Sequence, residues 1–303
     1  MNRSKILGAT ALASLMSAGV AQAEMSVSGY VLGAFADSDG GGLTNYNTSE
    51  TVTVSYSDSL NNGMGLTASM NIKDTLQTLV TIDTGMGSIN FSADGRGDSA
   101  LDKVDGSTAC YGLFWCASAY NSTYNDGDSL SGNSIRYVSP SINGFTIQAS
   151  HGLETAGTVL AVDSVGVTGS IMGATVKAGF ADINYDNGTH ASGLSTEVDK
   201  TPSMYAIGYS IAGLDLGYAF YDSDDTASSE ETQYGVGTSM MGMYLGAQFA
   251  THDTTGNDTD YMTLTAVKSM GPASFSYEYI ELDEAGGTAN DTDTHLFAYS
   301  IGF

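Results

Sequence analysis

The sequence predicts an all-β protein, a closed transmembrane barrel of sixteen antiparallel strands with short turns at one rim and long loops at the other. Three observations support this fold class. Apolar residues alternate with small or polar residues at a period of two, as in strands that separate two environments. The longest nearly apolar run after the N-terminal region, 240–247, is far shorter than the roughly 20 residues that a membrane-spanning helix needs. The links between the segments alternate between short and long.

The composition is acidic and rich in glycine. Of 303 residues, 34 are Asp or Glu and only 9 are Lys or Arg, so the formal charge is −25. Such a surface repels phosphates, which excludes nucleic acid as a partner. A helical enzyme is disfavoured because charged helix-forming residues are scarce while 38 residues are glycine. The acids are interspersed with apolar residues, so the chain is not a disordered acidic polymer.

Residues 1–23 read as a signal peptide, with Arg3 and Lys5 at the positive start, an apolar stretch over 6–20 and an A-x-A cleavage motif at the end. The alternative is a membrane anchor, but the apolar stretch is too short to span a bilayer. We expect export and cleavage, which leave 24–303 as one barrel domain. The leader carries two bases and no acid, so the mature charge becomes −27.

Export to an oxidising compartment changes how the two cysteines are interpreted. Cys110 and Cys116 flank five residues, and a local structural disulfide is the expected outcome. A metal site would need two further ligands, and none stands at a suitable spacing. A redox site usually has C-x-x-C spacing, which this pair lacks.

Residues 213–222 illustrate the alternation. Large apolar side chains occupy one face and smaller or polar ones the other: Leu214, Leu216, Tyr218 and Phe220 against Asp215, Gly217, Ala219 and Tyr221. The segments 143–151, 172–180 and 242–251 repeat the pattern. A soluble β-sandwich also alternates, but its polar face usually carries many charges. Here the second face is mostly Gly, Ser, Thr, Asn and Gln, which suits a narrow aqueous lumen with the apolar face toward lipid.

The alternating segments and their links give the expected strand boundaries. The sixteen strands are expected at 24–36, 48–58, 64–73, 76–83, 87–93, 133–139, 143–151, 158–168, 172–180, 201–211, 213–222, 231–240, 242–251, 259–270, 272–282 and 293–303. Short links are expected at 86–87, 141–144, 212–213, 241–242 and 271–272, and long, mostly acidic links at 37–47, 94–132, 181–200, 222–231, 253–260 and 281–293. Short periplasmic turns and long extracellular loops are the layout of outer-membrane barrels, whose closure leaves no strand edge in lipid.

The final strand carries the most specific signal. Its apolar face consists of Phe297, Tyr299, Ile301 and the terminal Phe303. Together with the segment Ala-Glu-Met-Ser-Val-Ser-Gly at 23–29, this strand resembles the Gram-negative general porins, especially the alphaproteobacterial kind. The resemblance implies a homotrimer in the Gram-negative outer membrane, in contact with its lipid and lipopolysaccharide. It also implies that the barrel-assembly machinery recognises the terminal strand.

The longest connection is the expected constriction. In the porins that this sequence resembles, the corresponding loop folds inward and narrows the pore with acids that face bases on the wall. The resemblance therefore implies that 94–132 folds into the lumen; the alternative is an ordinary extracellular loop. The implied constriction residues are Asp94, Asp98, Asp102 and Asp105, with Arg96 and Lys103 among them and Arg136 on the wall.

Bases that could balance these acids are few. The expected mature chain has seven, of which Lys73, Arg136 and Lys177 point into the lumen by alternation. We therefore expect a net negative constriction that favours cations. If the loop acids lie far from the narrowest point, selectivity is weak instead.

Thirteen of the acids fall in 222–231, 253–260 and 281–293. Dense carboxylates at an outer rim can bind divalent cations and bridge lipopolysaccharide phosphates, although solvated loop charge is the simpler interpretation. Residues 182–188 superficially resemble a calcium loop, but the glycine stands one place late and position twelve is Gly193 rather than Glu. We expect no cofactor or dedicated metal site, and at most weak Ca²⁺ binding by acidic loops.

We predict passive diffusion of ions and small hydrophilic solutes, without catalysis. A barrel hydrolase is the rival class, but no G-x-S-x-G, H-E-x-x-H or P-loop motif occurs. Ser150 and His151 are adjacent, yet neighbours on a strand point to opposite faces and cannot readily share a hydrogen bond. A third class is a structural or adhesive barrel with a plugged lumen, which single-channel conductance separates from a porin.

Overall fold

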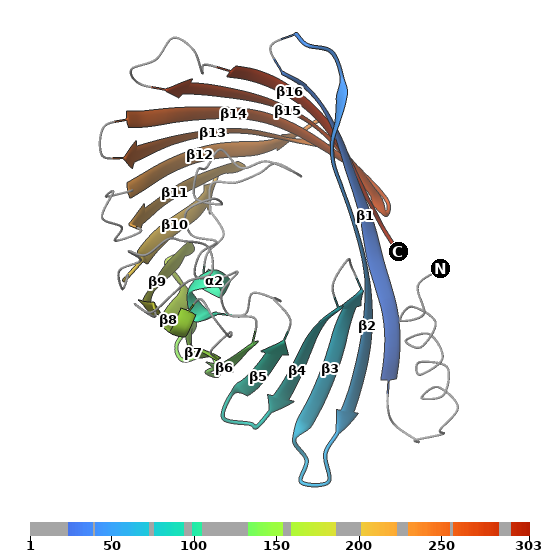
Figure 1. Cartoon of the computed structure of the whole chain (residues 1–303), viewed down its shortest axis with the longest axis vertical. Coiled ribbons are helices and arrows are strands. Elements are labelled where there is room, and N and C mark those ends of the chain that lie inside the picture. Colours follow the sequence, from blue (N-terminus) through green and yellow to red (C-terminus); the bar gives the residue numbers. More distant parts are fainter. Residues whose placement is uncertain are drawn as a thin grey trace.

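The structure is a computed structural model that describes residues 24–38, 40–72, 76–93, 99–104, 133–153, 159–185, 201–222, 230–254, 257–284 and 292–303. These residues form sixteen antiparallel strands and one short helix, α2 (Ala100–Val104). The strands are β1 (Glu24–Ser38), β2 (Thr44–Ser59), β3 (Gly65–Ile72), β4 (Leu76–Asp83), β5 (Ser88–Ala93), β6 (Asn133–Val138), β7 (Phe145–Leu153), β8 (Val159–Ile171), β9 (Ala174–Tyr185), β10 (Ser203–Ile211), β11 (Leu214–Asp222), β12 (Glu230–Met240), β13 (Met243–Thr254), β14 (Asn257–Met270), β15 (Ala273–Glu284) and β16 (Thr292–Gly302). Each strand pairs with its neighbours in chain order, and β1 pairs with β16 (Figure 1). The predicted closed antiparallel barrel is confirmed.

The seam between β1 and β16 closes the barrel. The paired register runs from Tyr30 opposite Gly302 to Ser38 opposite Thr294. Beyond it, the Gly29 amide donates to the Phe303 carbonyl at 2.9 Å, and the Phe303 amide donates to the Gly29 carbonyl at 3.0 Å. Every strand therefore has a partner on both sides, and the ring has no free edge along this seam.

Two-residue turns connect several strands at the periplasmic rim. Met172-Gly173, Ala212-Gly213 and Met241-Gly242 all have positive φ at both positions, between 51° and 84°. This is the type I′ arrangement, whose twist matches that of the flanking strands. The turns at 212–213 and 241–242 stand where the sequence predicted short links. The turn at 172–173 does not, since the sequence placed a strand there, and β9 instead begins at Ala174.

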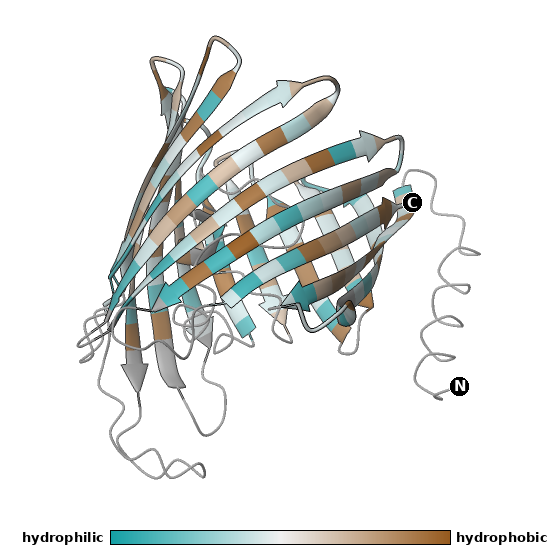
Figure 2. Cartoon of the chain, turned by 90° about the horizontal axis from the view of Figure 1, so that it is seen from above, coloured by the Kyte–Doolittle hydropathy of each residue, from teal (hydrophilic) through white to brown (hydrophobic). Residues whose placement is uncertain are grey.

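The two faces of the strands differ in character. Figure 2 shows apolar and polar bands alternating along individual strands. On β11, Leu214 and Leu216 are exposed on the outer face, while Ala219 and Tyr221 are buried on the inner face. The same alternation on β13 exposes Phe249 and buries Gln248. The face assignments made from the sequence for these strands are confirmed.

The prediction of a long acidic link at 253–260 is wrong. β13 and β14 remain paired up to Thr254 opposite Asn257, so the connection is short. The strands also extend into the links expected at 37–47, 181–200 and 281–293. The physical reason is that pairing continues past the apolar belt, since ladder hydrogen bonds and cross-strand contacts outweigh the weak strand propensity of Asp and Asn.

Strand length varies around the ring. β3 to β6 have only 6–8 residues, whereas β1, β2 and β14 have 14–16. The shortest strands of the described wall therefore lie side by side in one arc. Within the described ranges, no helix combines the length and apolarity required to cross a membrane.

Candidate functional site

The lumen of the barrel is the candidate site, and its lining is mostly polar. Residues directly opposite each other in an antiparallel sheet share a face, so the register assigns the inner side chains of neighbouring strands. Serine, threonine and amide side chains dominate the buried polar positions of this face. They are Asn90, Ser92, Ser134, Gln148, Ser150, Ser164, Gln233, Gln248, Thr263, Thr265 and Ser276.

The helix α2 lies inside the barrel against the wall, in contact with β7, β8 and β9 (Figure 1). Its first amide groups have no partner within the helix, as in any helix start. Ser150 and Ser164 supply partners: the Ala100 amide donates to the two hydroxyl oxygens at 2.8 Å and 2.9 Å. The Leu101 amide reaches the Ser164 hydroxyl at 3.3 Å. Part of the 94–132 connection is thus fixed to the lumenal wall.

The side chain of Leu101 packs on apolar side chains of the barrel wall. Leu101 is 7% exposed and belongs to a buried cluster on the inner face of β8 to β11. The wall members are Val162, Ala181, Ile183, Met204, Ala206, Ala219 and Tyr221. Apolar side chains facing an aqueous lumen would be costly unless they were covered, and Leu101 covers part of this group.

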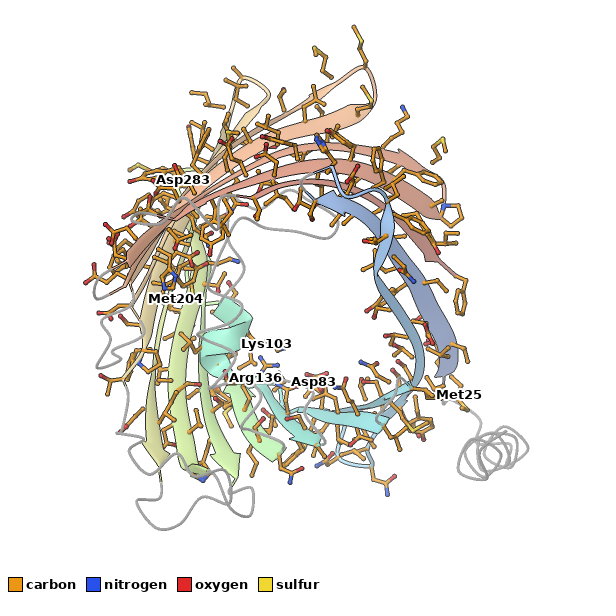
Figure 3. All side chains as sticks on the ribbon, turned by 45° about the horizontal axis from the view of Figure 1, so that its top comes forward. Met25, Asp83, Lys103, Arg136, Met204 and Asp283 are labelled. Carbon is orange, nitrogen blue, oxygen red and sulfur yellow. The ribbon has the colours of Figure 1, made fainter. Side chains whose placement is uncertain are left out.

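Two of the predicted constriction bases lie inside the ring, Lys103 on α2 and Arg136 on β6 (Figure 3). Lys103 is exposed. Arg136 is only 9% exposed, and one guanidinium nitrogen donates to the Gln148 amide oxygen at 2.5 Å. The charge of Arg136 is therefore held within the wall, while that of Lys103 meets the lumen.

Buried carboxylates occupy another arc of the wall. Glu231 on β12 accepts a hydrogen bond from the Gln233 amide, and Gln233 in turn accepts one from Gln248 at 3.3 Å. Glu278 on β15 accepts a hydrogen bond from the Ser276 hydroxyl at 2.8 Å. Both carboxylates are at most 3% exposed. The strands β12 and β15 therefore place carboxyl groups on the inner face, away from β6, which carries Arg136, and from the strands that contact α2.

The family of the chain follows from a comparison that covers nearly its whole length. The model of the Gram-negative porin family matches residues 8–302. The chain belongs to the Gram-negative porin family. No curated protein sequence matches it in a direct comparison.

Solved structures share the fold of this porin at low sequence identity. A form of OmpT, an outer membrane protein of Vibrio cholerae, that lacks loop L8 superposes with a TM-score of 0.71 at 16% identity, over 93% of this chain and 99% of that one. A mutant of the Rh. blastica porin gives 0.64 at 14% identity, over 92% of this chain and 100% of the other. An anion-selective porin from Comamonas acidovorans gives 0.64 at 13% identity, over 93% and 100%. At these identities the likeness establishes the fold alone.

Most of the predicted constriction residues of this porin lie outside the described residues: Asp94, Arg96, Asp98 and Asp105, together with the predicted Cys110–Cys116 pair. Asp102 falls within α2, but its side chain is not described. Lys103 and Arg136 are brought to the same inner region. Sequence reasoning missed Ser150, Ser164 and Leu101, although alternation along 143–151 already placed Ser150 on the inner face.

The predicted assembly signal lies on the last strand. The side chains of Phe297 and Ile301 are exposed on the outer face of β16, as is that of the terminal Phe303 beyond it. Tyr299 shares this face and packs on Gly33 of β1. Recognition of these residues by the assembly machinery stays a prediction.

The side chains of Ser150 and His151 diverge as predicted. The Ser150 hydroxyl lies inside the barrel, 2.6 Å from that of Ser164. His151 lies on the other face, where Nδ1 is 2.8 Å from a carboxylate oxygen of Asp163. Within the described part of the chain, no group of three or more His, Cys, Asp or Glu side chains is arranged to hold a metal ion.

Proposed function

We propose that this porin is a passive channel for ions and small hydrophilic solutes in the outer membrane, with a preference for cations. The observation that carries the proposal is the closed barrel with a lumen lined by hydroxyl and amide groups. Such a lining replaces part of the hydration of a polar solute without binding it tightly, so solutes enter and leave down their gradients.

Porins of similar fold can differ in ion preference, so the fold does not decide it. The excess of acidic over basic side chains in the lumen supports a preference for cations. The Comamonas acidovorans porin of similar fold is described as anion-selective. In this chain, the described lumenal positions carry the acids Glu24, Asp83, Asp215, Glu231 and Glu278 against the bases Lys103, Arg136 and Lys177. The whole chain carries 34 acids and 9 bases. A negative lumen raises the local concentration of cations and so biases the current toward them.

A planar-bilayer recording tests both halves of the proposal. Purified protein is added under a KCl gradient, and conductance steps and the zero-current potential are recorded together. We expect steps with a reversal potential of the sign given by cation preference. A reversal potential of the opposite sign would overturn the preference, and a complete absence of steps would favour a structural or adhesive barrel with a plugged lumen.

Catalysis is not part of the proposal. The Ser150 hydroxyl is engaged with Ser164 and the Ala100 amide inside the barrel, while His151 pairs with Asp163 outside it. A hydrolase needs nucleophile and base within hydrogen-bond reach. Incubation of purified porin with ester and peptide substrates is expected to give no turnover above buffer.

A homotrimer is the assembly that we propose. The six residues of β5 span only about 20 Å along the strand, and less along the membrane normal because strands tilt, whereas the outer apolar band of a barrel is about 25 Å tall. A neighbouring subunit at the β3–β6 arc would shield this low wall from lipid. One solved form of Vibrio cholerae OmpT, which shares the fold, is described as a trimer. Native mass spectrometry in detergent is expected to give three copies.

Export with cleavage of the leader and contact with lipopolysaccharide complete the proposal. The outer face near the extracellular end carries carboxylates on neighbouring strands, including Asp163, Asp182, Asp253, Asp260 and Asp283. Divalent cations could bridge such groups to lipopolysaccharide phosphates, with weak affinity at any single position. N-terminal sequencing of the mature protein is expected to begin at Glu24, and chelation of Ca²⁺ is expected to weaken co-purification of lipopolysaccharide.

A further inference from the structure

We infer that Leu101, Ser150 and Ser164 form an anchor that holds α2 against the lumenal wall and thereby sets the free width of the lumen beside it. The inference rests on the proposed function, because lumen width matters to transport only if the barrel conducts. Within the described residues, α2 is the part of the 94–132 connection that touches the wall, and it lies mainly against β8 and β9, with β7 beside them. These three residues are positioning residues, because none of them needs to touch the solute.

The polar half of the anchor is a pair of hydroxyl groups. Ser150 on β7 and Ser164 on β8 stand opposite each other, with their oxygens 2.6 Å apart. The Ala100 amide is shared between them at 2.8 Å and 2.9 Å, and the Leu101 amide reaches Ser164 at 3.3 Å. All these groups are buried, so water cannot easily replace the hydrogen bonds. The pair supplies hydrogen-bond acceptors from the wall to the first amides of α2, as N-cap side chains do in other helices.

The apolar half explains an anomaly of the lumen. The inner face of β5 to β7 and of β13 and β14 is mostly polar, yet β8 to β11 present Val162, Ile183, Met204 and Tyr221 inward. Large apolar side chains on a water-filled wall carry a hydration cost that a covering side chain removes. Leu101 belongs to the same buried cluster as these four residues. These apolar wall residues therefore form the packing surface for Leu101 of α2. Without that contact they would face water.

The two halves fix different properties of the connection. Hydrogen bonds to two amides orient the first turn of α2, while burial of Leu101 holds that turn close to the wall. With both in place, Lys103 remains at one side of the lumen (Figure 3). Loss of either half frees the turn to move away from the wall, so the open cross-section fluctuates.

The test compares two buried serine pairs, one that bonds the amides of α2 and one that does not. The anchor variant is Ser150→Ala with Ser164→Ala. The matched control is Ser92→Ala with Ser134→Ala, because these hydroxyls also form a buried inner-face pair across neighbouring strands, 2.7 Å apart on β5 and β6. A third variant, Leu101→Ser, removes the apolar half, and Ser164→Thr keeps the hydroxyl as a conservative rescue.

Two readouts separate the anchor from the proposed function. In planar bilayers, we expect open-channel current noise to rise severalfold in the anchor and Leu101 variants, with an unchanged sign of the reversal potential because no charge is altered. In folded protein in detergent, we expect trypsin to cleave after Lys103 at least tenfold faster in the same variants. The control pair and Ser164→Thr should match the parent protein in both assays.

The cleavage and noise measurements decide whether the anchor exists, and the presence of conductance steps decides whether the protein is a channel. Equal cleavage and equal noise in the anchor and control variants would overturn the anchor, as would acceleration of cleavage in both serine pairs. If the parent protein gives no conductance steps, the proposed function fails, while the cleavage assay still decides whether the anchor exists. If the double variant does not fold, Leu101→Ser and Ser164→Thr are compared by cleavage alone; equal rates then overturn the anchor.

Discussion

The ring of Tyr299 occupies the space in which a Cβ on Gly33 would stand: such a Cβ would lie 2.6 Å from Cε1, Cζ and Oη of the tyrosine. The two residues face each other across the β1–β16 seam. Four residues earlier, the Phe303 ring covers Gly29 in the same way, with the nearest ring atom 2.5 Å from a Cβ position. The side chains of Tyr299 on the last strand and of the terminal Phe303 thus lie on two glycines of the first strand.

Substitution of Gly33 by alanine is expected to destabilise the folded barrel by about 1–3 kcal/mol, because the added methyl group overlaps the Tyr299 ring. The nearest atoms to the added Cβ all belong to the tyrosine side chain, so a Gly33→Ala/Tyr299→Ala double variant should cost less than the sum of the two single variants. Guanidinium titration in detergent measures the unfolding free energies. Additive single costs would contradict the direct contact.

The turn at Ala212 stores a small backbone strain. Ala212 has a φ of 53°, in a region that costs an L-residue roughly 1 kcal/mol or more. Ala212→Gly is expected to raise stability by up to about 1 kcal/mol, because glycine adopts this conformation freely. Ala219→Gly within β11 serves as the control and is expected to lower stability. A loss of stability with Ala212→Gly would mean that the turn does not demand a positive φ.

If the outer face of β14 contacts lipid, the stability cost of an arginine on that face should depend on its depth in the membrane. Leu264 and Met270 are exposed on the same outer face, Leu264 near the middle of the strand and Met270 at its end. Leu264→Arg should cost about 2–4 kcal/mol, and Met270→Arg about 0–1 kcal/mol, since arginine at the end reaches the interface. Unfolding from lipid vesicles measures both. Equal costs would argue against a membrane centred on Leu264.

The two inner bases should differ in their effect on ion preference. Lys103→Gln and Arg136→Gln each remove one positive charge, so both are expected to increase cation preference. The shift in zero-current potential should be larger for Lys103, on the order of twofold, because Lys103 is exposed to the lumen whereas Arg136 is buried and donates to Gln148. A larger effect at Arg136 would place the narrowest point beside β6 instead of beside α2.

The barrel could be predicted from the sequence because its main signal is local. Alternation along 213–222 depends on one strand only, and it correctly separated Leu214 and Leu216 from Ala219 and Tyr221. Strand pairing in a meander also follows chain order, so few alternatives for the topology remain once the strands are found. The terminal aromatic strand then linked this pattern to a family.

Strand ends were harder to predict because composition competes with pairing. Asp253, Asp258 and Asp260 suggested a loop, yet all three lie on paired strands. Met172 looked like the start of a strand, but its positive φ places it in a turn. In both places the partner strand decides, and a single segment contains no information about its partner.

The site depended on contacts that no local pattern contains. The Ala100 amide meets Ser150 and Ser164, which lie 50 and 64 residues further along the chain. The acidity of 94–132 drew attention to its carboxylates, whereas the described part of that connection is held by a leucine and two backbone amides. Small uncharged residues give no chemical signal until the fold brings them together.

The seam also governs when the barrel can be completed. Among the described strands, each neighbour in the ring is also a neighbour along the chain, except for β1 and β16. One edge of β1 therefore stays unpaired until β16 is in place, however many of the other strands have already paired. An exposed edge of that kind is a template for aggregation. For this protein, the interval between the formation of β1 and that of β16 is the period in which a holding partner is most needed.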